Sequence, residues 1–431
     1  MLVTRRESAQ RQASSPRIGL AVAGGGPVGL VYEIGALRAL DEALDGIDFN
    51  HLDVYVGVSA GAVTAALLAN QLKTGQLCHV FISNASASDE HPLDPRIFLT
   101  PAFGEYGRRL ASVPRFLWES CWHYFKNPLD RSFLLSLTRL GRALPSGFFD
   151  NEPIHDYLAR LWLKPGCTND FRQLANKLYV VAVDLDTGES VKFGAPGYDQ
   201  VPISRAVQAS SALPGLYPPV EIDGRYFVDG VLLKTMHASV ALQEELDLLL
   251  CLNPLVPFDA RLAVAAGRST QVGRLVEGGL PAVLSQTFRA LIHSRLQVGM
   301  RQYDSEYEHS DVILFEPNRD DAKLFFTNVF SFSGRRWICE HAYRTTRQDL
   351  LTRHEELEPI LARHGVQLRM DVLEDHERHY DSGLRDQRGL ATPAKYRSPL
   401  VRDLHSTLDR LEEAVEERGG GAPAIRSGIP D

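Results

Sequence analysis

Two glycine-rich turns, each between an apolar run and a segment with helical periodicity, constrain the fold of this chain most strongly. The first apolar run, residues 18–23, leads into three consecutive glycines, after which apolar residues recur at helical spacing. The second run, residues 52–56, leads into a Gly-x-Ser-x-Gly turn and an alanine- and leucine-rich segment. Repeated strand–turn–helix units are typical of α/β proteins. We therefore predict a three-layer α/β fold in which helices flank a central, mostly parallel sheet.

The rest of the chain adds strands and helices to this sheet. Residues 178–185 and 190–193 flank a glycine-containing turn and predict a hairpin. Further strands are expected at 226–228, 247–252 and 311–315, and further helices at 203–213, 283–300, 337–361 and 400–417.

Shifts in composition divide the chain into four parts. Residues 1–16 are polar and predict a flexible leader, and residues 17–317 predict one large α/β domain with loops and short helices inserted at about 86–145. Amphipathic, charged sequence at 318–417 predicts a helical C-terminal extension, and residues 418–431 predict a disordered tail.

Composition and charge exclude several classes of protein. With 44% hydrophobic and 23% charged residues among 431, the chain has the apolar side chains for a sizeable core, which excludes a fibrous or globally disordered protein. A formal net charge of −8 gives no overall basic field, so we expect no nucleic-acid partner. Five scattered cysteines, no recognisable export signal and no apolar run of membrane-spanning length favour the cytoplasm, with peripheral membrane contact left open.

The first glycine turn also fits the pattern of dinucleotide-binding proteins. Gly24, Gly26 and Gly29 satisfy Gly-x-Gly-x-x-Gly between a strand and a helix. Proteins of that class carry an acidic residue at the end of the second strand, where it binds a ribose hydroxyl. Here the second strand ends in the serine-containing turn instead, so we expect no nucleotide cofactor. The sequence shows no cluster of metal-ligating residues, and we expect no metal.

The second glycine turn has the pattern of a nucleophile elbow. Gly57 and Gly61 flank Ser59, and glycines there permit a tight strand-to-helix turn that projects the serine hydroxyl above the sheet. A helix N-cap is the simpler interpretation of Ser59, but it does not explain both glycines. A serine nucleophile needs N–H donors for the oxyanion. The glycines at 24–26 can supply them, because neighbouring α/β units end at the same sheet edge.

Three segments together resemble the patatin-like phospholipases. They are GGGPVGLVYEIGALRAL, GVSAG and AVQASSALPGLYPPVEIDGRYFVDG, and they match a glycine-rich oxyanion segment, Gly-x-Ser-x-Gly and an Asp-Gly motif. The similarity covers about residues 17–72 and 178–255. It implies that Ser59 is the nucleophile and that Asp229, followed by Gly230, is its partner in a dyad without histidine. Residues 17–317 would then be the catalytic domain.

The resemblance also assigns roles within the first turn. Gly25 and Gly26 would donate to the oxyanion, while Gly24 and Gly29 would shape the loop. Val28 stands where many family members have Arg or Lys, and the third motif lacks its second small residue. Both departures bear on substrate preference rather than on the chemistry.

The proton acceptor for Ser59 can also be sought without the family, since Asp and His are the usual general bases. His237 lies eight residues past Asp229, but a surface or helix-start histidine explains it more simply. For Asp229 the simpler interpretation is a turn aspartate before a glycine. The strand before Asp229 and the family match favour its catalytic role.

These observations predict a serine lipid acyl hydrolase that cleaves acyl esters of phospholipids or lysophospholipids without metal or cofactor. Two alternatives remain open: an acyltransferase that uses the same serine, and a non-catalytic lipid-binding protein. The aromatic segment 325–332 would either insert at a membrane interface or pack the C-terminal helices onto the core.

Overall fold

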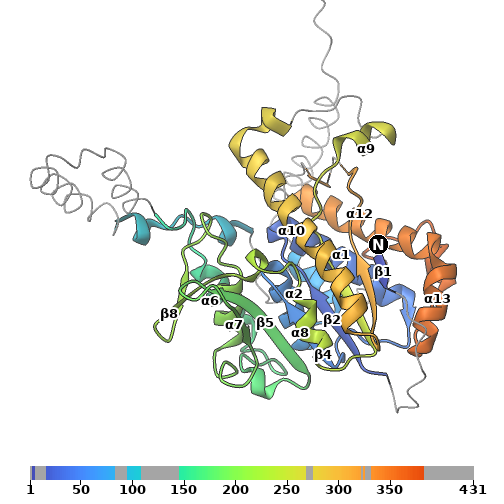
Figure 1. Cartoon of the computed structure of the whole chain (residues 1–431), viewed down its shortest axis with the longest axis horizontal. Helices are drawn as coiled ribbons and strands as arrows, with labels where there is room; N and C mark the ends of the chain where they lie inside the picture. Colours follow the sequence, from blue (N-terminus) through green and yellow to red (C-terminus); the bar gives the residue numbers. More distant parts are fainter. Residues whose placement is uncertain are drawn as a thin grey trace, which may run out of the picture.

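A computed structural model describes residues 2–4, 16–82, 95–107, 145–267, 275–321, 324–325 and 332–382 (Figure 1). Over these residues a mixed, mostly parallel sheet lies between two layers of helices, which confirms the predicted fold class. Most of the predicted insertion at 86–145, the predicted helix at 400–417 and the predicted tail at 418–431 fall outside the described residues.

The centre of the sheet is parallel and its edges are antiparallel, with β10, β9, β2, β4 and β5 forming the parallel part. The predicted hairpin is confirmed as β5 and β6. In spatial order the strands are β1 (Leu2–Thr4), β10 (Asp311–Phe315), β9 (Leu248–Leu252), β2 (Ile18–Val22), β4 (Val54–Gly57), β5 (Lys177–Asp184), β8 (Arg225–Asp229) and β7 (Val220–Ile222), with β6 (Ser190–Phe193) also paired to β5.

Helices cover both faces of this sheet (Figure 1). The α-helices are α1 (Gly26–Ala43), α2 (Ala60–Ala69), α3 (Thr74–Phe81), α6 (Glu152–Leu161), α7 (Ile203–Ser210), α8 (Ala238–Leu242), α9 (Ala260–Ala265), α10 (Gly279–Glu306), α12 (Phe332–Thr352), α13 (His354–Arg363) and α14 (Met370–Leu373). Short 3-10 helices are η1 (Pro95–Leu99), η3 (Phe171–Gln173), η4 (Gly230–Leu232) and η5 (Leu275–Gly278), and β3 (Leu44–Asp45) pairs with β11 (Gln367–Leu368).

Alternation along the strands divides the core into two apolar layers. On β2, Leu20 and Val22 belong to the layer formed with α1, α2, α7 and α12, whereas Ala21 belongs to the layer formed with α8 and α10. Because helices cover both faces of the sheet, β2 is apolar throughout and does not alternate between apolar and polar residues. This explains why the parallel strands stand out in the sequence as short continuous apolar runs.

The C-terminal helices pack into the same core as the sheet. A Cβ atom on Gly35 of α1 would lie 2.3 Å from the carbonyl oxygen of Cys339, so only glycine permits the close approach of α12. The continuous helix predicted at 337–361 is wrong in one respect, because the chain leaves helical geometry at Arg353 and forms α12 and α13. Leu350 and Leu357, on either side of this break, both belong to the apolar core.

The N-terminal residues differ from the expected flexible leader. Leu2–Thr4 form β1 and pair antiparallel with β10, so this part of the prediction is wrong. An edge strand exposes unpaired N–H and C=O groups, and β1 satisfies those of β10. Residues 5–15 fall outside the described part of the chain. Among the helices that the structure describes, none combines the length and the apolarity needed to cross a bilayer.

Of the aromatic segment 325–332, the side chain of Phe325 is described. Its ring centroid lies 5.5 Å from that of Phe258, and the guanidinium carbon of Arg289 lies 4.9 Å from the same ring. Phe325 therefore packs against other parts of the chain. Residues 326–331 fall outside the described residues.

Candidate active site

Ser59 occupies a strained turn between β4 and α2. Its backbone angles are φ 55° and ψ −124°, a conformation that side-chain-bearing residues rarely adopt. Strain of this kind is stored at functional sites and is held in place by the surrounding structure. The turn has the geometry of a nucleophile elbow, in which a sharp strand-to-helix turn presents the serine side chain.

The two glycines of the elbow are required by close packing. A Cβ atom on Gly57 would lie 2.5 Å from the Cα of Ala62, and one on Gly61 would lie 2.4 Å from the carbonyl oxygen of Val22. Both contacts involve backbone atoms, which cannot move aside as a side chain can. The Gly-x-Ser-x-Gly spacing thus lets β4, the turn and α2 pack against β2 without a clash.

Asp229 ends β8 and meets Ser59 inside the protein. The Ser59 side chain interacts with the Asp229 carboxylate, and the backbone N–H of Val231 donates a hydrogen bond to that carboxylate at 2.9 Å. Asp229 is fully buried, and burial raises its pKa to about 7, although both interactions act in the opposite direction. The two sequence-predicted residues are therefore together, with a carboxylate that changes protonation near neutral pH.

His237 lies nearby but has a different partner. It precedes α8, as expected for a helix-start histidine, yet it is buried rather than exposed. Its Nε2 lies 3.1 Å from the carbonyl oxygen of Gly230, to which a neutral ring donates. Burial lowers the pKa of His237 to about 4, so the ring is neutral at pH 7. His237 thus braces the turn that follows Asp229.

The glycine-rich turn before α1 packs against the Ser59 turn. A Cβ on Gly24 would lie 2.8 Å from the Cβ of Ser59, and one on Gly25 would lie 2.6 Å from the Cα of Gly29. Gly26, the first residue of α1, has φ 58° and open space around its Cβ position. The turn therefore brings backbone N–H groups and the positive end of the α1 dipole to the side of Ser59.

Ser210, at the end of α7, is hydrogen-bonded to the backbone of the Ser59 turn. Its Oγ accepts a hydrogen bond of 2.9 Å from the backbone N–H of Ser59 and donates one of 2.6 Å to the carbonyl oxygen of Val181. Ser210 is fully buried. Sequence reasoning did not identify this residue, because serine in an Ala-Ser-Ser-Ala run carries no signal of a contact made so far away along the chain.

Glu33 is a second buried residue that the sequence did not reveal. It lies on α1 one turn beyond Gly29, and its Oε2 accepts a hydrogen bond of 2.6 Å from the Thr64 hydroxyl of α2. Its Oε1 is buried without a hydrogen-bond partner in the described structure. Burial raises the pKa of Glu33 well above its usual value. The carboxyl group therefore links the helices that follow the two glycine turns.

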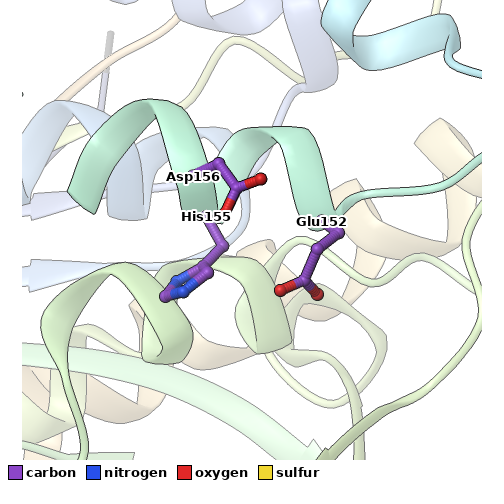
Figure 2. A group of neighbouring side chains, drawn as sticks. All are labelled: Glu152, His155 and Asp156. Carbon is purple, nitrogen blue, oxygen red and sulfur yellow. The ribbon is translucent and has the colours of Figure 1, made fainter. Parts of the chain in front are cut away.

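A separate polar cluster lies on α6 (Figure 2). Ligand atoms of Glu152, His155 and Asp156 lie within 4.8 Å of one another. The Arg205 guanidinium, however, donates to both carboxylate oxygens of Glu152, at 2.9 and 3.0 Å, and Gln208 donates to one of them. A metal ion would have to compete with this fixed positive charge, so the cluster is better explained as an ion pair between α6 and α7.

Comparison with known proteins identifies the family. The patatin-like phospholipase profile matches residues 20–242, just over half of the chain, and the chain belongs to this family. Uncharacterized NTE family proteins of Mycobacterium bovis and Mycobacterium tuberculosis are 27% identical over 232 residues. That match covers 53% of this chain but only 29% of each relative. The curated relatives are thus much longer than the region that they share with this protein.

Two solved structures show distant similarity. VipD from Legionella pneumophila matches with 18% identity and a TM-score of 0.36, over 81% of this chain and 70% of VipD. The type III effector ExoU, known also in complex with SpcU from Pseudomonas aeruginosa, matches with 16% identity and a TM-score of 0.32, over 96% of this chain and 66% of ExoU. Both TM-scores are below 0.5, so these structures define neither the site nor the activity of this chain.

Proposed function

We propose that this protein is a serine lipid acyl hydrolase in which Ser59 is the nucleophile and Asp229 its proton acceptor. The main support is the interaction between the Ser59 side chain and the buried Asp229 carboxylate, at a strained turn beside a glycine-rich loop. Membership of the patatin-like phospholipase family supports an acyl ester of a phospholipid or lysophospholipid as the substrate.

Acylation follows from this arrangement. Ser59 Oγ attacks the carbonyl carbon of the ester while Asp229 takes the hydroxyl proton. The bond from the carbonyl carbon to the leaving oxygen then breaks, and Asp229 returns the proton to that oxygen. The products are acyl-Ser59 and a free alcohol. A pKa of about 7 suits both proton transfers, because the carboxylate is partly ionised at neutral pH and its acid form readily gives the proton back.

Deacylation uses the same residues with water as the nucleophile. Asp229 takes a proton from water as the water oxygen attacks the acyl carbon. The bond from that carbon to Ser59 Oγ breaks, and the proton passes from Asp229 to Ser59. The free carboxylic acid leaves, and the protein returns to its starting state. One carboxylate is sufficient for both half-reactions, so this scheme assigns no proton transfer to His237.

The oxyanion of each tetrahedral intermediate needs donors close to Ser59. We assign this role to the backbone N–H groups of Gly25 and Gly26, with Gly24 and Gly29 shaping the turn. The Ser59 N–H already donates to Ser210 and is therefore not available to the substrate. The positive end of the α1 dipole adds to the stabilisation of negative charge at this position.

Covalent labelling tests the nucleophile. A fluorophosphonate reacts with activated serines, and mass spectrometry of the digested protein should place the adduct on the peptide that contains Ser59. Asp229→Asn should slow the labelling strongly, since Ser59 loses its proton acceptor. Ser211→Ala, which changes a serine outside the site, should label like the wild type. Absence of an adduct on Ser59 in folded protein would contradict the proposal and favour a non-catalytic lipid-binding role.

A further inference from the structure

The apolar residues of α10, the longest helix that the structure describes, change environment along its length. Towards the C-terminal end, Ile292, Leu296 and Met300 are buried and pack in the same core layer as α8. Exposed apolar side chains lie mainly in the N-terminal half, and we call them the α10 stripe: Leu280, Leu284, Phe288, Leu291 and Val298. The spacing of the stripe follows the helical repeat, so its members lie along one side of the helix.

The α10 stripe has no partner in the described structure. Leu280 is 69% exposed and Leu291 is 60% exposed. The preceding η5 adds exposed Val276, and α9 adds exposed Leu262 and Val264. Single exposed apolar residues are normal in a soluble protein, but an aligned group of this size marks a surface that binds something apolar.

Arginines surround this surface in a chain that is acidic overall. Residues 260–303 contain six Arg, no Lys, no Asp and a single Glu, whereas the whole chain has a formal net charge of −8. Arg295 and Arg301 are exposed on α10, and Arg261 is exposed next to Leu262 on α9. Asp259 precedes α9, and Asp304 and Glu306 lie in the last turn of α10, so carboxylates bound the arginine-rich stretch at both ends. Exposed aliphatic side chains next to arginines are complementary to an anionic lipid surface.

The same part of α10 is tied to the segments that border the candidate active site. Gln286 forms two hydrogen bonds with the backbone of Phe258, at 3.1 and 2.7 Å. Phe258 ends the segment that begins at Pro254, and Pro254 packs on Gly25 and Gly29 of the oxyanion turn. Further along, the Arg295 guanidinium donates to the carbonyl oxygen of Leu232 at 2.7 Å, in the turn that follows Asp229.

These contacts place α10 at the carboxyl edge of the parallel strands, where Ser59 also lies. In Figure 1 the N-terminal turns of α10 and the short α9 extend beyond the body of the sheet. A membrane that rested on them would lie at the edge from which a lipid must approach Ser59. Long arginine side chains would reach the lipid head groups while the α10 stripe enters the boundary between the head groups and the acyl chains.

We propose that the α10 stripe, with α9 and η5, is the surface by which this protein docks on anionic lipid bilayers. The proposal rests on the proposed lipid hydrolase activity for its biological meaning, but the binding itself does not need catalysis. The proposed membrane contact therefore differs from the aromatic segment 325–332 that the sequence suggested. Phe325 packs against Phe258 and Arg289, whereas the α10 stripe is exposed.

Vesicle flotation of the full chain in a Ser59→Ala background tests this proposal without consuming the lipid. Vesicles of phosphatidylcholine with phosphatidylglycerol should carry the protein to the top of the gradient. Much less protein should float with vesicles of phosphatidylcholine alone, or with the mixed vesicles when salt is added. Leu280→Ser with Leu291→Ser should lower the partition coefficient roughly tenfold or more, because two side chains no longer enter the apolar boundary. The matched control is Leu163→Ser with Leu185→Ser, whose side chains are 83% and 52% exposed outside this surface. It should float like the parent.

The outcomes separate the docking surface from the proposed activity. In a background that retains Ser59, both pairs of substitutions should hydrolyse a water-soluble p-nitrophenyl ester at the wild-type rate. If that ester is not cleaved but flotation depends on Leu280 and Leu291, the activity fails and the docking surface stands. Equal flotation of the two pairs would overturn the docking proposal. So would sedimentation data in which the α10 pair converts a dimer to a monomer without changing flotation, because the stripe would then join two copies of the chain.

Discussion

The side chain of Ser59 interacts with the carboxylate of Asp229, although the two residues follow strands that are not neighbours in the sheet. Ser59 follows the parallel strand β4, and Asp229 ends β8, which runs antiparallel to β5. Because β5 pairs with both β4 and β8, it sets the distance between the two residues. The proposed mechanism depends on this pair, since it assigns the serine proton to a buried carboxylate rather than to a histidine.

The pH dependence of the reaction should report the protonation of Asp229. Burial raises the pKa of this carboxyl group to about 7, and only the ionised form can accept the Ser59 proton. The value of kcat/KM for a soluble ester should therefore rise with pH and level off above about 7. His237→Gln should show the same rise of kcat/KM with pH, since the pKa of His237 is lowered to about 4. Loss of this rise in His237→Gln would show that the histidine is the base.

Gly25→Ala should lower kcat by roughly 10²-fold or more, if the turn supplies oxyanion donors. The new methyl group would lie 2.6 Å from both the Cα of Gly29 and the Cγ of Pro254, so the turn must move. Gly104→Ala is the matched control, because nothing lies within 4 Å of its Cβ position. Steady-state kinetics on a soluble ester provide the measurement. An unchanged kcat for folded Gly25→Ala would remove Gly25 from the oxyanion site.

Ser210→Ala should weaken both the fold and the catalytic step. The substitution leaves the buried N–H of Ser59 without its acceptor, which costs about 1–3 kcal/mol of the free energy of unfolding. The strained elbow also loses a constraint, so kcat should fall while KM stays close to the wild-type value. Urea unfolding and steady-state kinetics measure the two effects. Ser211→Ala, one residue further along, is the control, and equal kcat values in the two variants would argue against a positioning role for Ser210.

Glu33→Gln should change how stability depends on pH. The folded protein keeps a proton on Glu33 above the usual pKa of 4.5, while the unfolded chain releases it. The folded state therefore binds more protons, and this site makes the wild type less stable as the pH rises through that range. Glutamine cannot ionise, so the variant should gain in stability relative to wild type as the pH rises above the usual pKa of glutamate. A difference in unfolding free energy that is independent of pH would mean that Glu33 is ionised in the folded protein.

The sequence predicted the parts of the fold that depend on local patterns. Ile18–Val22 and Val54–Gly57 are buried on both faces of a parallel sheet, so each is a short apolar run, and β10 occupies the predicted 311–315. In the two glycine turns, Gly25, Gly57 and Gly61 each meet neighbouring backbone directly, which explains why glycine stands at those positions. These signals lie within a few residues of each other and can be read without a structure.

The features that the sequence did not reveal depend on contacts between distant segments. Ser210 and Glu33 are ordinary helix residues until α7 and α1 pack beside the elbow. Leu2–Thr4 are too few to show a strand pattern, and they form β1 because the edge of β10 is available. The exposed stripe of α10 was hidden for another reason. Apolar residues recur along the whole helix, and the sequence does not show which of its turns the core will cover.

Hydrolysis of lipid acyl esters by Ser59 and Asp229 is tested by the release of free fatty acid from phospholipid and lysophospholipid vesicles, followed by mass spectrometry for wild type, Ser59→Ala and Asp229→Asn. We expect release by the wild type and none above background in either variant, with all three proteins equally folded by circular dichroism. Fatty-acid release by Asp229→Asn at the wild-type rate, or by Ser59→Ala at any rate above background, would contradict the proposed roles of the two residues.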